Sequence, residues 1–211
     1  MNFRETQIYI ISAGPGNKKY LTIEALEKIN SVDILAGSKR LKNLAKGRDY
    51  IVLNDIVNDA FNVIEKNDNK TVGILVSGDA GFFSLERALI EKFGKSQVEV
   101  IPGISIIQAS FAALKESWND ISVYSFHGRN NIQCSLEDIK DKKIVILCEN
   151  IEAIREFINI NTEFLNNYYI YIFQNYSIEG ELIINVKEPN DLNNLQKGKL
   201  TTVIITPRGK A

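Results

Sequence analysis

The chain has 211 residues and a formal net charge of −1, and its composition is 45% hydrophobic and 24% charged. That balance predicts a packed core and leaves no strong overall field to hold nucleic acid. No apolar run approaches the roughly 20 residues that cross a bilayer. The polar N-terminus does not resemble a signal peptide, so we expect a cytoplasmic protein with no membrane or nucleic-acid partner.

The residues that most often bind metals are scarce. The chain has one histidine, His127, and two cysteines, Cys134 and Cys148, which form no CxxC pair. A site built from several histidines is therefore excluded within one chain, and we predict no protein-bound metal. Any Ser-His-Asp chemistry would have to use His127. Without a secretion signal, both thiols are expected to be free in a reducing cytosol.

Strand and helix patterns alternate through the first half of the chain. Apolar runs predict buried strands at residues 7–11, 32–36, 50–53, 71–76 and 98–101. Apolar residues at helical spacing follow these runs and predict helices at residues 21–29, 38–44, 56–66, 83–93 and 106–114. This alternation is typical of an α/β domain with a largely parallel, five-stranded sheet.

Three of these strands end in glycine-rich turns, which are Gly14-Pro15-Gly16, Gly78-Asp79 and Pro102-Gly103. The carboxyl ends of parallel strands share one edge of a sheet, where α/β proteins bind their ligands. We therefore predict that the three turns line one pocket for a small molecule, with the carboxylate of Asp79 at its rim. The alternative role for Asp79 is the N-cap of the helix that follows.

None of these turns carries a phosphate-binding fingerprint. Counted from Gly14, the pattern G-x-G-x-x-G needs a glycine where Lys19 stands. The pattern G-x-x-x-x-G-K-[ST] does not occur anywhere in the chain. A ligand held mainly by its phosphate groups is therefore disfavoured.

The pattern changes near residue 118, where strands begin to follow one another with fewer helices. Strands are predicted at residues 121–126, 143–147, 168–173, 181–186 and 201–206, with one helix at residues 151–158. The strands at 168–173 and 181–186 are expected to be neighbours in a sheet. We therefore predict two α/β domains, residues 1–117 and residues 118–211.

The three turns, taken with their neighbouring residues, resemble the loops of a known enzyme family. Gly14-Pro15-Gly16 with Leu21-Thr22, Ser77-Gly78-Asp79 and Pro102-Gly103-Ile104-Ser105 have the order and spacing of the tetrapyrrole methylases. The resemblance covers almost the whole chain. It implies two α/β domains with a ligand cleft between them, in a cytosolic homodimer.

One branch of that family is more similar than the rest. Residues 32–41, Trp118-Asn119-Asp120 and Ser125-Phe126-His127-Gly128-Arg129 are similar to the branch that methylates carbon 5 of cobalt-precorrin-7 in cobalamin synthesis. The His-Gly-Arg element is the most specific of these segments, whereas the glycine-rich turns identify only the wider family.

Three positions depart from the family pattern. That pattern usually has glycine where Ser12 stands, proline where Ala80 stands and serine where Ile106 stands. These are small changes on loops that would bind mostly through backbone groups, so they bear on individual contacts more than on the class of protein.

The resemblance implies that S-adenosylmethionine binds in the cleft between the domains as the methyl donor. A sulfonium donor has no phosphates, which agrees with the missing phosphate-binding patterns. Carried over from the family, the donor site comprises Pro15, Ser77, Gly78, Asp79, Phe82, Ser105, Ile106 and Leu147. The protein then has only to align the reacting atoms and exclude water, so neither a metal ion nor a covalent intermediate is required.

The corrin-type substrate that the resemblance implies carries many carboxylates, which favour arginine and lysine at its site. Arg129 is the first candidate, and Lys39 and Arg40 are further ones. His127 is expected to relay a proton or to bind an acetate or propionate side chain. Two alternatives to substrate binding stay open. Lys39 and Arg40 would lie on a solvated helix face, and His127 would form a hydrogen bond with the backbone at a strand end.

Three other functions stay open. The first is a methylase of the same fold that acts on uroporphyrinogen, a ribosomal RNA ribose or a diphthamide precursor. The others are a nucleotide-dependent oxidoreductase and a non-enzymatic binding protein of methylase descent.

In some organisms the resembling enzyme is fused to a second methyltransferase, which methylates carbon 15 and removes a carboxyl group. Here the chain ends at Ala211. We therefore expect a single methylation, with the companion activity on a separate chain.

Overall fold

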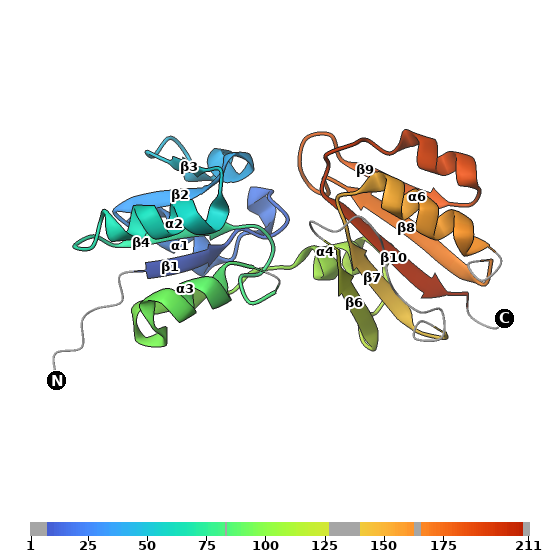
Figure 1. The fold of residues 1–211 in the computed structure, drawn as a ribbon, viewed down its shortest axis with the longest axis horizontal. Coiled ribbons are helices and arrows are strands. Elements are labelled where there is room, and N and C mark those ends of the chain that lie inside the picture. The colour runs from blue at the N-terminus through green and yellow to red at the C-terminus, as the bar shows by residue number, and fades with distance from the viewer. Residues whose placement is uncertain (1–7, 83, 127–139, 163–165, 209–211) are drawn as a thin grey trace. The chain divides into compact units, whose positions relative to one another are not determined.

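The computed structural model describes residues 8–82, 84–126, 140–162 and 166–208 (Figure 1). The chain divides into two compact units, residues 1–109 and 110–211. In the sequence, this division falls inside helix α4 (Ile106–Leu114), whereas the change of pattern begins near residue 118. Each unit contains a five-stranded sheet.

The first unit holds a sheet with the strand order β3-β2-β4-β1-β5. Its strands are β1 (Ile8–Ser12), β2 (Ile34–Ser38), β3 (Ile51–Leu53), β4 (Val72–Val76) and β5 (Val98–Ile101). Every pairing in this sheet is parallel, and β1 lies between β4 and β5. This confirms the predicted α/β fold and its five parallel strands.

Helices cover both faces of this sheet. They are α1 (Ile23–Ser31), α2 (Ile56–Glu65), α3 (Glu86–Phe93) and the 3-10 helix η2 (Lys39–Ala45). One core cluster joins α2 and α3 to Ile10, and the other joins α1 and η2 to Ile11. Successive side chains of a strand point to opposite faces, so the two clusters lie on opposite sides of the sheet.

Local contacts explain where these helices begin. Thr22 is the N-cap of α1, and its Oγ1 accepts a hydrogen bond from the amide of Ala25 at 3.1 Å. Asp55 caps α2 in the same way. The predicted helix at residues 38–44 is present as η2, in which Leu41 and Leu44 are buried. Their three-residue spacing suits the 3.0 residues per turn of a 3-10 helix.

The second unit holds a mixed sheet with the strand order β6-β7-β10-β8-β9. Its strands are β6 (Ile121–Ser125), β7 (Lys143–Leu147), β8 (Tyr168–Gln174), β9 (Leu182–Val186) and β10 (Thr201–Pro207). Only β6 and β7 pair in parallel, and the remaining pairings among the described residues are antiparallel. The predicted pairing of residues 168–173 with 181–186 is confirmed as β8 with β9.

Helix α6 (Ile151–Ile160) packs on the second sheet through Ile151, Ile154, Phe157 and Ile158, which share one helix face. The short 3-10 helix η4 (Pro189–Asn194) adds its buried leucine to the same core, and the sequence pattern did not predict it. In the described parts of the two units, no helix has the length and apolar character needed to cross a membrane.

Candidate functional site

Three loops follow the carboxyl ends of neighbouring strands in the first unit. We call them the β1 loop (residues 13–17), the β4 loop (residues 77–82) and the β5 loop (residues 102–105). Because β4, β1 and β5 are adjacent and parallel, the three loops leave the same edge of the sheet. The prediction that the glycine-rich turns share one edge is therefore confirmed.

The β1 and β4 loops are joined by backbone hydrogen bonds. The Gly14 amide donates to the Gly78 carbonyl at 3.1 Å, and the Gly78 amide donates to the Gly14 carbonyl at 2.7 Å. Both glycines have positive φ, 61° and 72°, a conformation that other residues adopt only with strain. A Cβ on Gly78 would meet no atom within 4 Å, so the space beside its Cα is open.

Asp79 joins the β4 loop to the β5 loop. Its Oδ1 accepts a hydrogen bond from the Gly81 amide at 3.0 Å, and its Oδ2 accepts one from the Gly103 amide at 2.8 Å. Asp79 is not the N-cap of the next helix, because α3 begins only at Glu86. A carboxylate has about four lone-pair positions, so Asp79 keeps capacity to bind a ligand as well.

The β5 loop is held against β1. A Cβ on Gly103 would lie 2.4 Å from the Cβ of Ser12 and 3.0 Å from the Gly78 carbonyl oxygen, so glycine alone fits there. The Thr22 hydroxyl also donates to the Pro102 carbonyl at 3.4 Å, which is a long and weak hydrogen bond. The three loops therefore form one connected arrangement.

The β5 loop continues directly into α4. The Ser105 amide donates to Oε1 of Gln108 at 2.9 Å, and the Gln108 amide donates to Oγ of Ser105 at 3.2 Å. This reciprocal pair fixes the beginning of α4. Ser105 and the first helical residue, Ile106, both remain partly accessible.

The predicted donor residues fall in both units. All of them except one lie on the three loops or at the first residue of α4: Pro15, Ser77, Gly78, Asp79, Phe82, Ser105 and Ile106. Ser77 is exposed, Pro15 is buried, and the remaining residues are partly exposed. Leu147 is buried at the end of β7 in the second unit.

The predicted substrate residues are only partly described. His127 and Arg129 lie outside the described residues. Lys39 is exposed on η2, as a solvated helix face requires, but Arg40 is half-buried. The Tyr50 hydroxyl donates to the Ser38 carbonyl at 2.9 Å, and burial raises the pKa of Tyr50 while the nearby Arg40 charge lowers it. Arg40 therefore lies near Tyr50, two residues after the carboxyl end of β2.

Metal-binding residues do not gather in the described parts of the chain. No group of three or more histidine, cysteine, aspartate or glutamate side chains there could hold an ion. Cys148 is a buried, free thiol whose Sγ donates to the Asn150 carbonyl at 3.5 Å. Burial raises the pKa of this thiol, which keeps it protonated.

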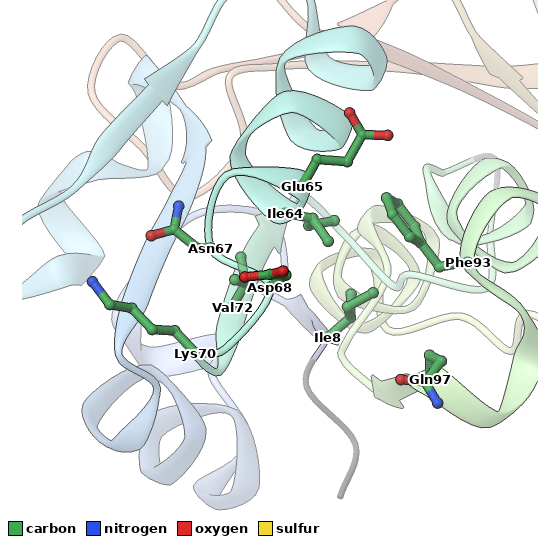
Figure 2. A pocket seen from close by; sticks show the side chains of 9 residues that line it. All are labelled: Ile8, Ile64, Glu65, Asn67, Asp68, Lys70, Val72, Phe93 and Gln97. Atoms are coloured by element: carbon green, nitrogen blue, oxygen red, sulfur yellow. The ribbon is translucent and has the colours of Figure 1, made fainter. Parts of the chain in front are cut away.

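A cavity of about 290 Å³ lies at the opposite edge of the first sheet, where β1 and β4 begin (Figure 2). Its lining consists of Ile8, Ile64, Glu65, Asn67, Asp68, Lys70, Val72, Phe93 and Gln97. Glu65 is paired with Lys92 at 2.6 Å, and the polar groups on the rim mix acidic, basic and amide side chains. The sequence did not predict this cavity, and its charged groups are of both signs.

Comparisons with known proteins agree with the resemblance. A sequence profile of the tetrapyrrole (corrin/porphyrin) methylases matches residues 7–190. The probable cobalt-precorrin-7 C(5)-methyltransferase of Methanocaldococcus jannaschii is 31% identical over 206 residues, which cover 93% of this chain and 96% of that protein.

Two solved structures have the same fold. The precorrin-6Y methylase of Archaeoglobus fulgidus aligns with a TM-score of 0.68 at 22% identity, over 96% of this chain and 98% of that one. The uroporphyrin-III C-methyltransferase of Thermus thermophilus, complexed with S-adenyl homocysteine, aligns with a TM-score of 0.69 at 16% identity, over 95% and 92% of the two chains. At these identities the likeness establishes the fold of this chain.

Proposed function

Because the chain belongs to the tetrapyrrole (corrin/porphyrin) methylase family, we propose that it transfers a methyl group from S-adenosylmethionine to carbon 5 of precorrin-7 or cobalt-precorrin-7 in cobalamin biosynthesis. The observation that carries this proposal is the similarity to the Methanocaldococcus jannaschii protein, which extends over almost the full length of both chains. Family membership argues against a nucleotide-dependent oxidoreductase. The 31% identity of that match, against 16% for the uroporphyrin-III C-methyltransferase, favours the corrin substrate over uroporphyrinogen, ribosomal RNA or a diphthamide precursor.

The connected loops of the first unit suit the methyl donor. The open space beside Gly78 leaves room for the donor, and the carboxylate of Asp79 offers an acceptor for its amine or hydroxyl groups. The exposed hydroxyl of Ser77 and the partly exposed Ser105 add further polar groups. Because the donor has no phosphates, the lack of a phosphate cradle is consistent with this ligand.

The chemical task of the protein is alignment. When bound, the donor supplies an activated methyl group on a sulfonium. Carbon 5 forms the new carbon–carbon bond, the methyl–sulfur bond breaks with its electron pair left on sulfur, and the macrocycle loses a proton. Residues that hold donor and acceptor at about 3–3.5 Å and exclude water therefore supply most of the catalysis.

The acceptor is expected to be held by basic groups. A corrin precursor carries several carboxylates, and an arginine binds one of them through two parallel hydrogen bonds. We assign this role to Arg129 first and to Arg40 and Lys39 next, with His127 as proton relay or carboxylate donor. Lys39 and Arg40 both follow the carboxyl end of β2, and Arg40 is the half-buried one of the two.

The proposal also covers the oligomeric state of the protein and its partners. We expect a cytoplasmic homodimer that acts on a small-molecule substrate, as the resemblance implies. The methylation of carbon 15 and the loss of a carboxyl group are assigned to a separate methyltransferase.

Two experiments test the proposal. Isothermal titration should show binding of S-adenosylmethionine and no binding of NAD. Incubation with the donor and either form of precorrin-7 should then add a methyl group, detected by mass spectrometry. Donor binding without turnover on either substrate would favour another acceptor or a non-enzymatic binding protein.

A further inference from the structure

Ser12 makes a side-chain contact that the sequence did not predict. It is the last residue of β1 and is fully buried, with 0% of its surface exposed. Its Oγ accepts a hydrogen bond from the amide of Ala80 at 2.8 Å. Ala80 is itself 1% exposed, so water cannot replace Ser12 as the acceptor for this amide.

This contact completes the attachment of the β4 loop. Three consecutive residues of the loop, Gly78, Asp79 and Ala80, are each held by a different partner. Gly78 pairs with the backbone of Gly14, Asp79 accepts from Gly103, and Ala80 donates to Ser12. While all three hydrogen bonds are intact, they fix the orientation of the β4 loop.

We propose that Ser12 is a positioning residue for the methyl donor. This inference rests on the proposed function, in which the donor binds against Gly78 and Asp79. Ser12 is buried and cannot contact the donor itself, so it acts through the amide of Ala80. By fixing Ala80, it sets the orientation of the backbone and carboxylate that the β4 loop presents at the carboxyl edge of the sheet.

The packing around Ser12 restricts what can stand there. The Cβ of Ser12 occupies the space that a side chain on Gly103 would need, which links the position of Ser12 to the β5 loop as well. A glycine at position 12 has no side-chain acceptor for the amide of residue 80, and a proline at position 80 has no N–H to donate. Serine at position 12 with alanine at position 80 leaves no unpaired amide, and neither does glycine at 12 with proline at 80. Glycine at 12 with alanine at 80 would leave the amide of residue 80 buried and unpaired.

The first test is the substitution Ser12→Ala, with the affinity for S-adenosylmethionine measured by isothermal titration well below the unfolding temperature. We expect the Kd to rise about tenfold, which corresponds to about 1.4 kcal/mol. The KM for the corrin substrate at saturating donor should stay near the wild-type value. Hydrogen exchange at the Ala80 amide should become faster in the variant.

Ser110→Ala is the matched control. Ser110 is also a fully buried serine, in α4, but its Oγ has no hydrogen-bond partner among the described residues. The same atoms are removed without leaving an amide unpaired, so donor affinity should be unchanged. A merely structural role for Ser12 predicts lower thermal stability with unchanged donor affinity, and that result would overturn the inference.

A compensating pair provides a second test with a different substitution at position 12. Ser12→Gly should weaken donor binding, and adding Ala80→Pro should restore at least part of the loss, because no amide then needs an acceptor. Simple addition of the two single effects would contradict the inference. Failure of the wild-type protein to bind the donor would overturn the proposed function as well, whereas normal wild-type binding with an unaffected Ser12→Ala variant overturns the inference alone.

Discussion

Asp79 illustrates how one side chain can serve the fold and the proposed site together. Each of its carboxylate oxygens accepts an amide hydrogen bond, one from Gly81 within its own loop and one from Gly103 in the neighbouring loop. The sequence predicted a carboxylate at the rim of a ligand pocket, and the structure adds that the same carboxylate joins two of the three loops. Removing the carboxylate should therefore weaken donor binding both directly and through a change in the shape of the site.

The corresponding prediction concerns Asp79→Ala. The variant should bind S-adenosylmethionine more weakly by about 1.5–3 kcal/mol, the range for a hydrogen bond to a charged group. Asp79→Asn keeps one acceptor oxygen and should lose less. Isothermal titration, with circular dichroism to verify folding, measures both. Unchanged donor affinity in a folded Asp79→Ala variant would remove Asp79 from the donor site.

A second prediction at this scale concerns Arg129 and His127, which lie outside the described residues. Lysine cannot reproduce the planar fork of arginine, so Arg129→Lys should raise the substrate KM markedly and leave donor affinity near normal. His127→Ala should lower turnover more than donor binding. If the two residues only stabilise the fold, both variants should instead show a lower melting temperature and equal losses for the two ligands.

At the scale of elements, the sequence predicted the positions of the strands better than their order in the sheets. All ten predicted strands appear within two residues of their expected ends, because apolar runs and turn residues act locally. The order β3-β2-β4-β1-β5 could not be read from the sequence, since it depends on contacts between distant segments. The bond from Ala80 to Ser12 was missed for the same reason, as it joins residues 68 positions apart.

The pairing of β2 with β4 offers a prediction about pH. The amide and hydroxyl of Thr71, just before β4, both donate to Oδ2 of Asp33, just before β2, at 2.8 Å. The backbone hydrogen bond from Thr71, followed by that from its hydroxyl, lowers the pKa of Asp33 from 3.8. A carboxyl whose folded pKa is depressed stabilises the fold above its unfolded pKa, and this contribution is lost as the pH falls through the folded value.

The variant Asp33→Asn should therefore be less stable than the wild type near neutral pH, and the difference should shrink as the pH falls below 3.8. Urea unfolding at a series of pH values measures this difference. Asp49→Asn, at another exposed aspartate of the same unit, is the control. A difference in unfolding free energy that persists unchanged in acid would show that the charge of Asp33 does not contribute.

At the scale of the whole molecule, the chain combines two units of different character. The first has an all-parallel sheet whose carboxyl edge carries the three connected loops, and the second has a mixed sheet covered by α6 and η4. The change from alternating strands and helices to successive strands led to the prediction of two domains, but the proposed reaction came from the resemblance of the loops and of Ser125 to Arg129. Glycine-rich loops without phosphate patterns restrict the ligand, and they do not identify the acceptor carbon.

The central claim is the transfer of one methyl group to carbon 5. It is tested most directly by incubating the purified protein with precorrin-7 or cobalt-precorrin-7 and S-adenosylmethionine carrying a ¹³C-labelled methyl group, followed by mass spectrometry and carbon NMR of the product. We predict one added methyl group, located at carbon 5, with no release of carbon dioxide. A methyl group on another carbon, a doubly methylated and decarboxylated product, or no methylation despite donor binding would contradict the claim.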